Sequence, residues 1–213
     1  MSLPIYPSFF EVLKNLRQYE NIGSLYTQNL FRDWRLRQNR LTWPTASLFH
    51  PVFINPFAVQ GLISSRTLSK RGNFLMHRLG TFQTGDWDQN LRPLNEHNLF
   101  HRFKQRFEEQ CPWHELDDFK KLTTKEQQQA FLRRGQEVDE LFESLKSKGC
   151  QWSPDILRIN IGRDGQIIRN SRGLHRSILL QILGQTRMPA YIHVIHKDFD
   201  LIKINDVLLQ QNQ

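Results

Sequence analysis

Residues 172–176, with the sequence Arg-Gly-Leu-His-Arg, carry side chains suited to binding a phosphate group. If a helix begins after Gly173, the free N–H groups of its first turn stabilise an anion, and glycine lets a ligand approach the backbone. Arg176 can hold two phosphate oxygens, His175 can donate a further hydrogen bond, and Arg172 adds positive charge. The alternative is structural: Gly173 ends a strand, His175 is partly buried in a helix, and Arg176 pairs with a surface acid.

Two acids on either side of a tryptophan form a second candidate site, at Asp86 and Asp88. Carboxylates can act as a catalytic base or bind Mg²⁺, and phosphoryl transfer usually needs both. The structural alternative is a tight loop in which one carboxylate caps a helix that begins near Gln89. A third acid, Asp164, is expected in a hairpin turn.

The histidines and cysteines show no metal-binding pattern. His193 and His196 are three residues apart in an expected strand, which would place them on opposite faces. Cys111 and Cys150 have no Cys or His neighbours at the spacing of zinc ligands. We therefore expect neither a zinc module nor a disulfide framework.

The residues around the phosphate motif predict a hairpin, a helix and a further strand. Apolar residues alternate over 157–161 and 166–170, with a Gly-Arg-Asp-Gly turn between them. Residues 177–183 have helical periodicity, and the alternation from Ala190 after Pro189 predicts another strand. These elements would place Gly173 between a strand and a helix.

Two longer amphipathic helices are predicted upstream, over 95–111 and 126–148, and Gly149 is expected to end the second. Both are expected to pack on the C-terminal sheet. Trp87 and Trp113 could stack on a base, or they could pack in the core or in a lid.

The N-terminal part contains a predicted helix after Ser8 and two basic segments, 30–40 and 64–78. In the first segment, arginines alternate with aromatic residues and could contact a phosphate backbone. The alternative is a helix that packs Trp34 and leaves the arginines in water.

The chain has 213 residues and a formal net charge of +8, so acidic partners such as nucleotides or nucleic acid are favoured. We expect no membrane partner, because no run approaches the roughly 20 apolar residues of a membrane span. The N-terminus lacks the pattern of a secretory signal, which predicts a cytoplasmic protein. The sequence does not indicate an oligomeric state.

The run from Ile159 to Phe199 resembles the ParB/sulfiredoxin-like superfamily, in which a hairpin leads to a Gly-x-x-Arg helix start and a strand that contains proline. More narrowly, it resembles ParB-like proteins with an Ile-Gly-Arg-Asp-Gly hairpin, a Gly-x-His-Arg helix start and an upstream Gly-Asp-Trp-Asp, here Gly85 to Asp88. The narrower resemblance covers about residues 55–199.

The resemblance implies an α+β fold, a small mixed sheet packed with helices, after a mostly helical and irregular N-terminal extension. The implied boundaries are 1–54 for the extension, 55–199 for the domain with its helical insertion and its core at 150–199, and 200–213 for the tail.

The resemblance also implies nucleotide binding, with ATP, ADP or CTP and Mg²⁺ as the cofactors. Gly173, His175 and Arg176 match the phosphate-binding signature. Leu174 stands where sulfiredoxins have their catalytic cysteine and ParB has a glutamate. Arg172 stands where the narrower ParB-like group, and the free-serine kinases of this fold, have an aspartate before the glycine.

Three functions are consistent with these features. The first is a nucleotide-dependent phosphotransferase or NTPase with catalytic or metal-binding roles for Asp86 and Asp88. The second is a nucleic-acid-binding module or ParB-like nuclease. The third is a catalytically degenerate binding subunit.

Overall fold

The computed structural model describes residues 52–63, 81–151, 157–170 and 173–200, together with 203 and 207. The helix expected after Ser8, the basic segments 30–40 and 64–78, and Arg172 lie outside the described residues.

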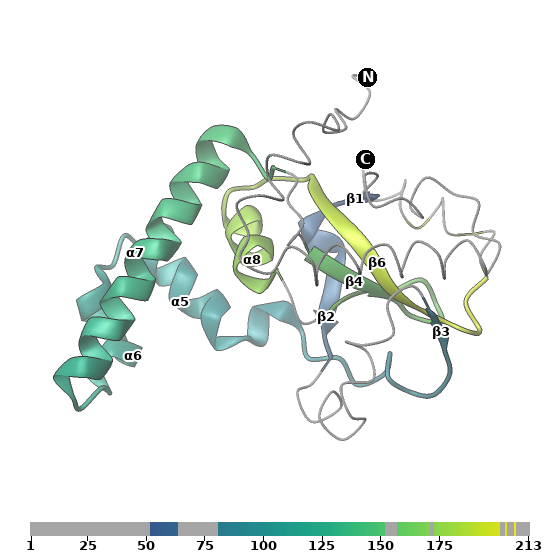
Figure 1. The fold of residues 1–213 in the computed structure, drawn as a ribbon, viewed down its shortest axis with the longest axis horizontal. Helices are drawn as coiled ribbons and strands as arrows, with labels where there is room; N and C mark the ends of the chain where they lie inside the picture. Colours follow the sequence, from purple (N-terminus) through teal and green to yellow (C-terminus); the bar gives the residue numbers. More distant parts are fainter. Residues whose placement is uncertain are drawn as a thin grey trace, which may run out of the picture.

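A six-stranded mixed sheet forms the centre of the described structure, which is an α+β fold (Figure 1). The predicted hairpin is confirmed: β4 (Leu157–Ile161) pairs antiparallel with β5 (Ile167–Arg169). The predicted strand after it is also confirmed, as β6 (Met188–His196), which runs parallel to β4. All nine residues of β6 are buried, including the polar residues His193 and His196, so both faces of this strand are covered.

Three shorter strands complete the sheet: β1 (Val52–Ile54), β2 (Val59–Leu62) and β3 (Thr81–Gln83). The sheet order is β1-β6-β4-β5-β2, and β3 pairs with β6 beside the end of that strand. The first strand pairs with β6 through Val52, three residues before the expected domain start at 55.

Among the described residues, the helical part consists of three main helices and four short ones. The helix α8 (Leu174–Ile182) contacts β4, and it also contacts both α5 (Asn98–Phe107) and α7 (Lys125–Lys148). Figure 1 shows these two helices with α6 on the side of α8 that is away from the sheet. The short elements are η2 (Pro56–Ala58), η3 (Leu94–Glu96), η4 (Trp113–Glu115) and α6 (Asp117–Lys120).

Local signals explain the ends of α7. Thr124 and Gln127 form a capping box, in which each side chain binds the backbone N–H of the other residue. Gly149 ends the helix with φ of 66°, a left-handed value that favours glycine. The prediction of a helix over 126–148 is therefore confirmed to within one residue.

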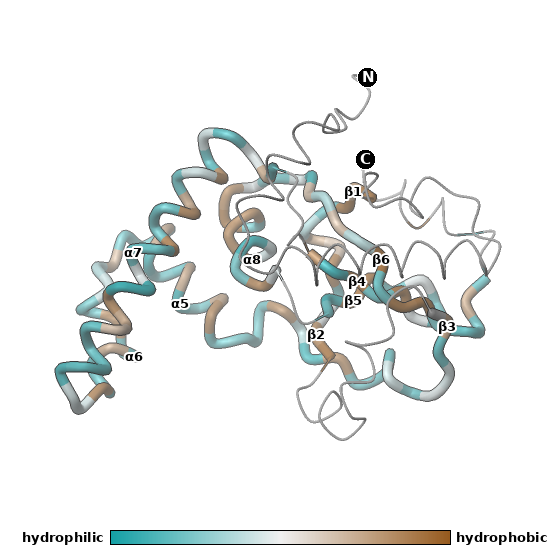
Figure 2. Tube along the Cα trace, viewed as in Figure 1, coloured by the Kyte–Doolittle hydropathy of each residue, from teal (hydrophilic) through white to brown (hydrophobic). Residues whose placement is uncertain are grey.

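The core lies mainly between the sheet and α8. Figure 2 shows apolar positions concentrated on the strands and on α8, while polar and apolar positions alternate along α7. A smaller cluster, with Trp87 and Val194, lies on the other face of the sheet. In the pairing with β4, Ile192 lies opposite Ile159 and Val194 lies opposite Asn160, so His193 forms a β-bulge. The bulge interrupts the simple alternation that placed His193 and His196 on opposite faces of the sheet.

None of the helices among the described residues combines the length and the apolar character that crossing a membrane requires.

Candidate functional site

Gly173 is the N-cap of α8 and has a left-handed conformation, with φ of 80° and ψ of 15°. A Cβ atom at this position would lie 2.9 Å from the Cα and 2.8 Å from Cδ1 of Leu157, at the start of β4. Glycine is therefore required both by the backbone conformation and by the close approach of the strand. As glycine has no capping side chain, the first turn of α8 remains suited to an external acceptor.

His175 projects from this first turn toward α5. Its ring lies 5.4 Å from that of Phe103, measured between centroids, and the residue remains open to solvent. Partial desolvation lowers the pKa of His175, and the positive charges of Arg169, Arg102 and Arg134 lower it further. The imidazole is therefore neutral at pH 7, in a positive local potential.

A second histidine experiences the same potential. His97 is the N-cap of α5, where its Nδ1 accepts a hydrogen bond of 3.1 Å from the N–H of Leu99. Its pKa is also lowered, first by desolvation and then by the charges of Arg92, Arg169 and Arg102. Positive charges from β5, α5 and α7 thus converge on the first turn of α8.

Arg169, the last residue of β5, belongs to this positive group, and burial lowers its pKa to about 10. Sequence reasoning missed Arg169 and His97 as site residues. Arg169 precedes Gly173 by only four residues, a proximity that could have identified it. His97 is brought to the site by the packing of α5 on α8, which no local motif indicates.

Arg176 has a different environment from His175. Its charge acts on the thiol of Cys150, just beyond the end of α7, where burial raises the pKa of the cysteine to about 11 and Arg176 opposes that shift. Successive residues of a helix are separated by about 100° around its axis, which accounts for the different surroundings. The structure thus brings His175 into the positive group and places Arg176 near Cys150.

The two candidate carboxylates, Asp86 and Asp88, are bound by Arg163 of the hairpin turn. The Arg163 guanidinium donates to Asp88 at 2.8 and 3.0 Å and to Asp86 at 2.9 Å, and its backbone N–H donates to Asp88 at 2.8 Å. The Asp88 side chain is completely buried, whereas that of Asp86 is 73% exposed. No helix begins near Gln89, so the expectation of a helix cap there is wrong.

Burial alone would raise the pKa of Asp88. The hydrogen bonds from the side chain and backbone of Arg163 outweigh that effect and hold the pKa below its ordinary value. Asp88 is thus an ionised carboxylate whose two oxygens already accept hydrogen bonds.

His196 and Trp87 complete the surroundings of Asp88. The Nδ1 atom of His196 accepts from the Asp198 N–H at 3.1 Å, and its Nε2 lies 2.8 Å from the Gly85 carbonyl oxygen, so a proton on Nε2 satisfies both contacts. Trp87 is buried beside His196, which favours the packing role for this tryptophan.

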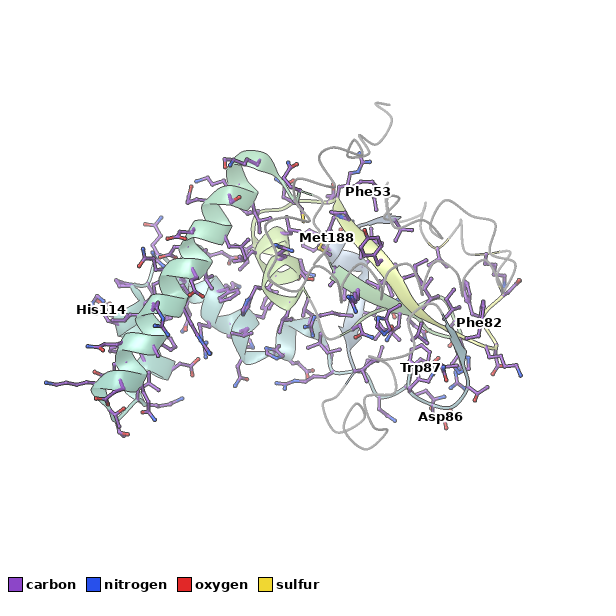
Figure 3. All side chains as sticks on the ribbon, viewed as in Figure 1. Phe53, Phe82, Asp86, Trp87, His114 and Met188 are labelled. Carbon is purple, nitrogen blue, oxygen red and sulfur yellow. The ribbon has the colours of Figure 1, made fainter. Side chains whose placement is uncertain are left out.

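The phosphate motif and the carboxylates lie at opposite ends of β4. Gly173 packs against Leu157 at the start of the strand, and the Cβ of Asp88 lies beside Gly162, just past its end. Five strand residues span about 16 Å. Figure 3 likewise places Asp86 and Trp87 near β3, away from α8.

The carboxylates therefore do not fit a magnesium site at the α8 N-terminus. Asp164 is in the hairpin turn, as expected, where its carboxylate accepts from Gln166 at 3.2 Å. Within the described ranges, no group of three or more His, Cys, Asp or Glu side chains could hold a metal ion.

A half-open cleft of about 760 Å³ adjoins the first turn of α8. It lies between α5, η4, α7 and α8, and His175 forms part of its wall. Trp113, the second tryptophan considered for stacking, is another part of the wall and is 9% exposed. Most of the remaining lining is apolar: Leu99, Phe103, Leu122, Ala130, Phe131, Gly135, Val138 and Leu141, with Arg102, Gln127, Arg134 and Glu137 as polar members.

Comparison of the chain with protein-family models, curated proteins and solved structures finds no match. The resemblance to the ParB/sulfiredoxin-like superfamily stays a prediction from its motifs.

Proposed function

We propose that this protein binds a phosphorylated ligand, specifically a nucleotide, with its phosphates at the first turn of α8. The observation that carries the proposal is the convergence of positive charge on that turn. Arg102, Arg134 and Arg169 come from three different elements, and all three lower the pKa of His175. Arg102 is also paired with Asp118, but the positive potential at this turn still favours an anionic ligand.

The contacts available to the ligand follow from the geometry. The first-turn N–H groups after Gly173 and the imidazole of His175 provide hydrogen-bond donors, and Arg169 provides nearby positive charge. Arg176 is a less direct participant than the motif suggests, because its charge acts on Cys150. Arg172 stays a predicted contributor outside the described residues.

The geometry supports binding more than it supports phosphoryl transfer. Asp86 and Asp88 are bound to Arg163 and lie about 16 Å from the proposed phosphates along β4. We therefore assign them no catalytic step. This favours the hypothesis of a catalytically degenerate binding subunit. The nucleic-acid-binding alternative depends on segments 30–40 and 64–78, outside the described residues.

Calorimetric titration with ATP, ADP and CTP, each with and without Mg²⁺, tests the proposal. We expect at least one nucleotide to bind, and His175→Ala to weaken that binding about tenfold, the effect of losing one hydrogen bond to a charged group. His101→Ala is the matched control, because His101 is an exposed histidine on α5 that does not line the cleft. Absence of binding by all three nucleotides, or equal losses in both variants, would contradict the proposal.

The pH dependence provides a second measure of the same binding event. The pKa values of His97 and His175 are lowered in the free protein, so both rings are neutral at pH 7. A bound phosphate would raise both pKa values, and binding would then take up protons and strengthen as the pH falls from 7 toward 6. Titrations in buffers with different ionisation enthalpies measure this uptake.

A further inference from the structure

The cleft wall on α7 is mostly apolar, with Arg134 near its middle and Gln127 and Glu137 as its other polar residues. Ala130, Phe131, Val138 and Leu141 line the cleft, and Val138 lies eight, seven and three residues from the other three, so they share one face of the helix. Arg134 also lines the cleft, exactly four residues from both Ala130 and Val138. A charged residue therefore stands in the middle of a mostly apolar face.

Trp113 of η4, which forms another part of the cleft wall, is held against α7 by hydrogen bonds and packing. The indole N–H of Trp113 donates to Asp139 at 2.9 Å, and Arg106 binds both oxygens of the same carboxylate at 3.0 Å. The Trp113 ring lies so close to Gly135 that a Cβ atom there would be 2.7 Å from it. A wall fixed in this way loses little conformational entropy when a ligand binds.

The charges in the cleft are distributed unevenly. Arg102 is paired with Asp118 through two hydrogen bonds of 2.6 and 2.8 Å, and Glu137 is exposed. Arg134 is exposed, and among the described residues it has no ion-pair partner. At the end bounded by His175, the charges that shift the imidazole are all positive, so this end favours an anion.

We propose that the cleft between α5, η4, α7 and α8 is a binding site for a small molecule with an aromatic ring and one anionic group. The ring would lie against the apolar wall that includes Phe103 and Trp113, and the anionic group would lie between Arg134 and His175. The volume of about 760 Å³ is in the range of small-molecule sites. This position adjoins the nucleotide site proposed above, and the two sites share His175 and the positive charge of Arg134.

The experiment compares three probes of graded chemistry by calorimetry. 2-Naphthoate has the ring and the carboxylate, 2-naphthylmethanol has the ring alone, and acetate has the charge alone. We expect 2-naphthoate to bind about tenfold more tightly than 2-naphthylmethanol, and acetate not to bind measurably.

Two variants of neighbouring arginines isolate the charged contact. Arg134→Ala should remove the preference for 2-naphthoate, whereas Arg133→Ala should leave it unchanged to within about twofold, because Arg133 does not line the cleft. Equal affinities of 2-naphthoate for the two variants would overturn the assignment of the anionic group.

Ala130→Phe tests the position of the ring, because Ala130 lines the cleft and a larger side chain would fill it. We expect this variant to lose 2-naphthoate binding and to keep nucleotide binding. Retained 2-naphthoate binding would overturn the proposal, whether or not nucleotides bind.

Nuclear Overhauser contacts between naphthyl protons and the Trp113 indole in the unmodified protein do not depend on any variant folding. Bound 2-naphthoate without such contacts would also overturn the proposal. Failure of nucleotide binding with these contacts present would refute only the nucleotide proposal.

Discussion

At the scale of single residues, Arg163 connects two segments that are far apart in the chain. Its guanidinium donates to Asp88, to Asp86 and to the Gly85 carbonyl oxygen, and so holds the 85–88 loop against the hairpin turn. The two carboxylate contacts differ in their contribution to stability, because Asp88 is buried and Asp86 is mostly exposed. An exposed ion pair contributes little to stability, whereas a buried carboxylate that loses its charge leaves its donors poorly satisfied.

We predict that Asp88→Asn lowers the free energy of unfolding by about 1.5–3 kcal/mol, because an uncharged amide replaces a buried acceptor of charge-assisted bonds. The matched variant Asp86→Asn should change it by less than about 1 kcal/mol. Urea denaturation of both variants measures the difference. Similar losses in the two variants would contradict the distinction between the buried and the exposed contact.

The contribution of Asp88 should depend on pH in a defined direction. Its pKa in the folded protein is below the ordinary value of 3.8, so its stabilising contribution is complete above that pH and is lost as the pH falls below it. The stability difference between the unmodified protein and Asp88→Asn should therefore be constant from pH 5 to 7 and shrink below about pH 4. A difference that stays the same down to pH 3 would be inconsistent with this linkage.

At the scale of secondary-structure elements, the position at which α8 begins determines the geometry of the proposed phosphate site. Sequence periodicity predicts a helix over 177–183, and the phosphate motif predicts a helix start directly after Gly173. The observed helix begins at Leu174, three residues before the periodic segment, which confirms that start. Ser177 explains part of this extension, because both its N–H and its hydroxyl donate to the carbonyl oxygen of Gly173, at 2.9 and 2.8 Å. The glycine and the serine together set the first turn on which the proposed phosphate site depends.

We predict that Gly173→Ala destabilises the protein by more than Gly184→Ala does. Both glycines have a positive φ, which costs an alanine about 1–2 kcal/mol. A Cβ at position 173 would also lie 2.9 Å from the backbone of Leu157, whereas nothing lies within 4 Å at position 184. We expect an additional loss of about 1–3 kcal/mol for Gly173→Ala, measured by thermal or urea denaturation.

Equal effects of the two substitutions would show that conformation alone, and not the contact with β4, requires glycine at position 173.

At the scale of the whole molecule, α8 connects the sheet to the α5–α7 helices. It packs against β4 on one side and contacts α5 and α7 on the other, as Figure 1 shows. The proposed nucleotide site and the cleft both lie at this junction, while the Asp88–Arg163 contacts lie at the far end of β4. The two ends of the sheet thus differ in chemical character: one is positive and open, and the other is closed by internal hydrogen bonds.

This arrangement predicts unequal local stability. The buried residues of α7 are Gly135, Val138 and Leu145, and none of residues 125–134 is buried, whereas all nine residues of β6 are. Amide hydrogen exchange should therefore be slowest in β6 and much faster in residues 125–134. Mass spectrometry of proteolytic fragments can compare the two segments, and equal exchange rates would contradict the prediction.

Local sequence signals determined much of the secondary structure. The hairpin over β4 and β5, the helix α7 with its end at Gly149, and the turn at Asp164 all follow from periodicity, capping and turn chemistry. These features depend on residues within a few positions of one another. The left-handed glycine at the helix start belongs to the same class, since strand, glycine and helix are adjacent in the chain.

Only the tertiary structure decided which candidate residues share a site. Arg163 and Asp88 are 75 residues apart in the chain, and their hydrogen bonds hold the 85–88 loop against the hairpin turn, at the far end of β4 from α8. Likewise, the packing of α5 and α7 beside α8 brings His97, Arg102 and Arg134 near His175. The periodicity of the sequence indicates which face of an element is apolar. The position of that face relative to a distant element depends on how the whole chain packs.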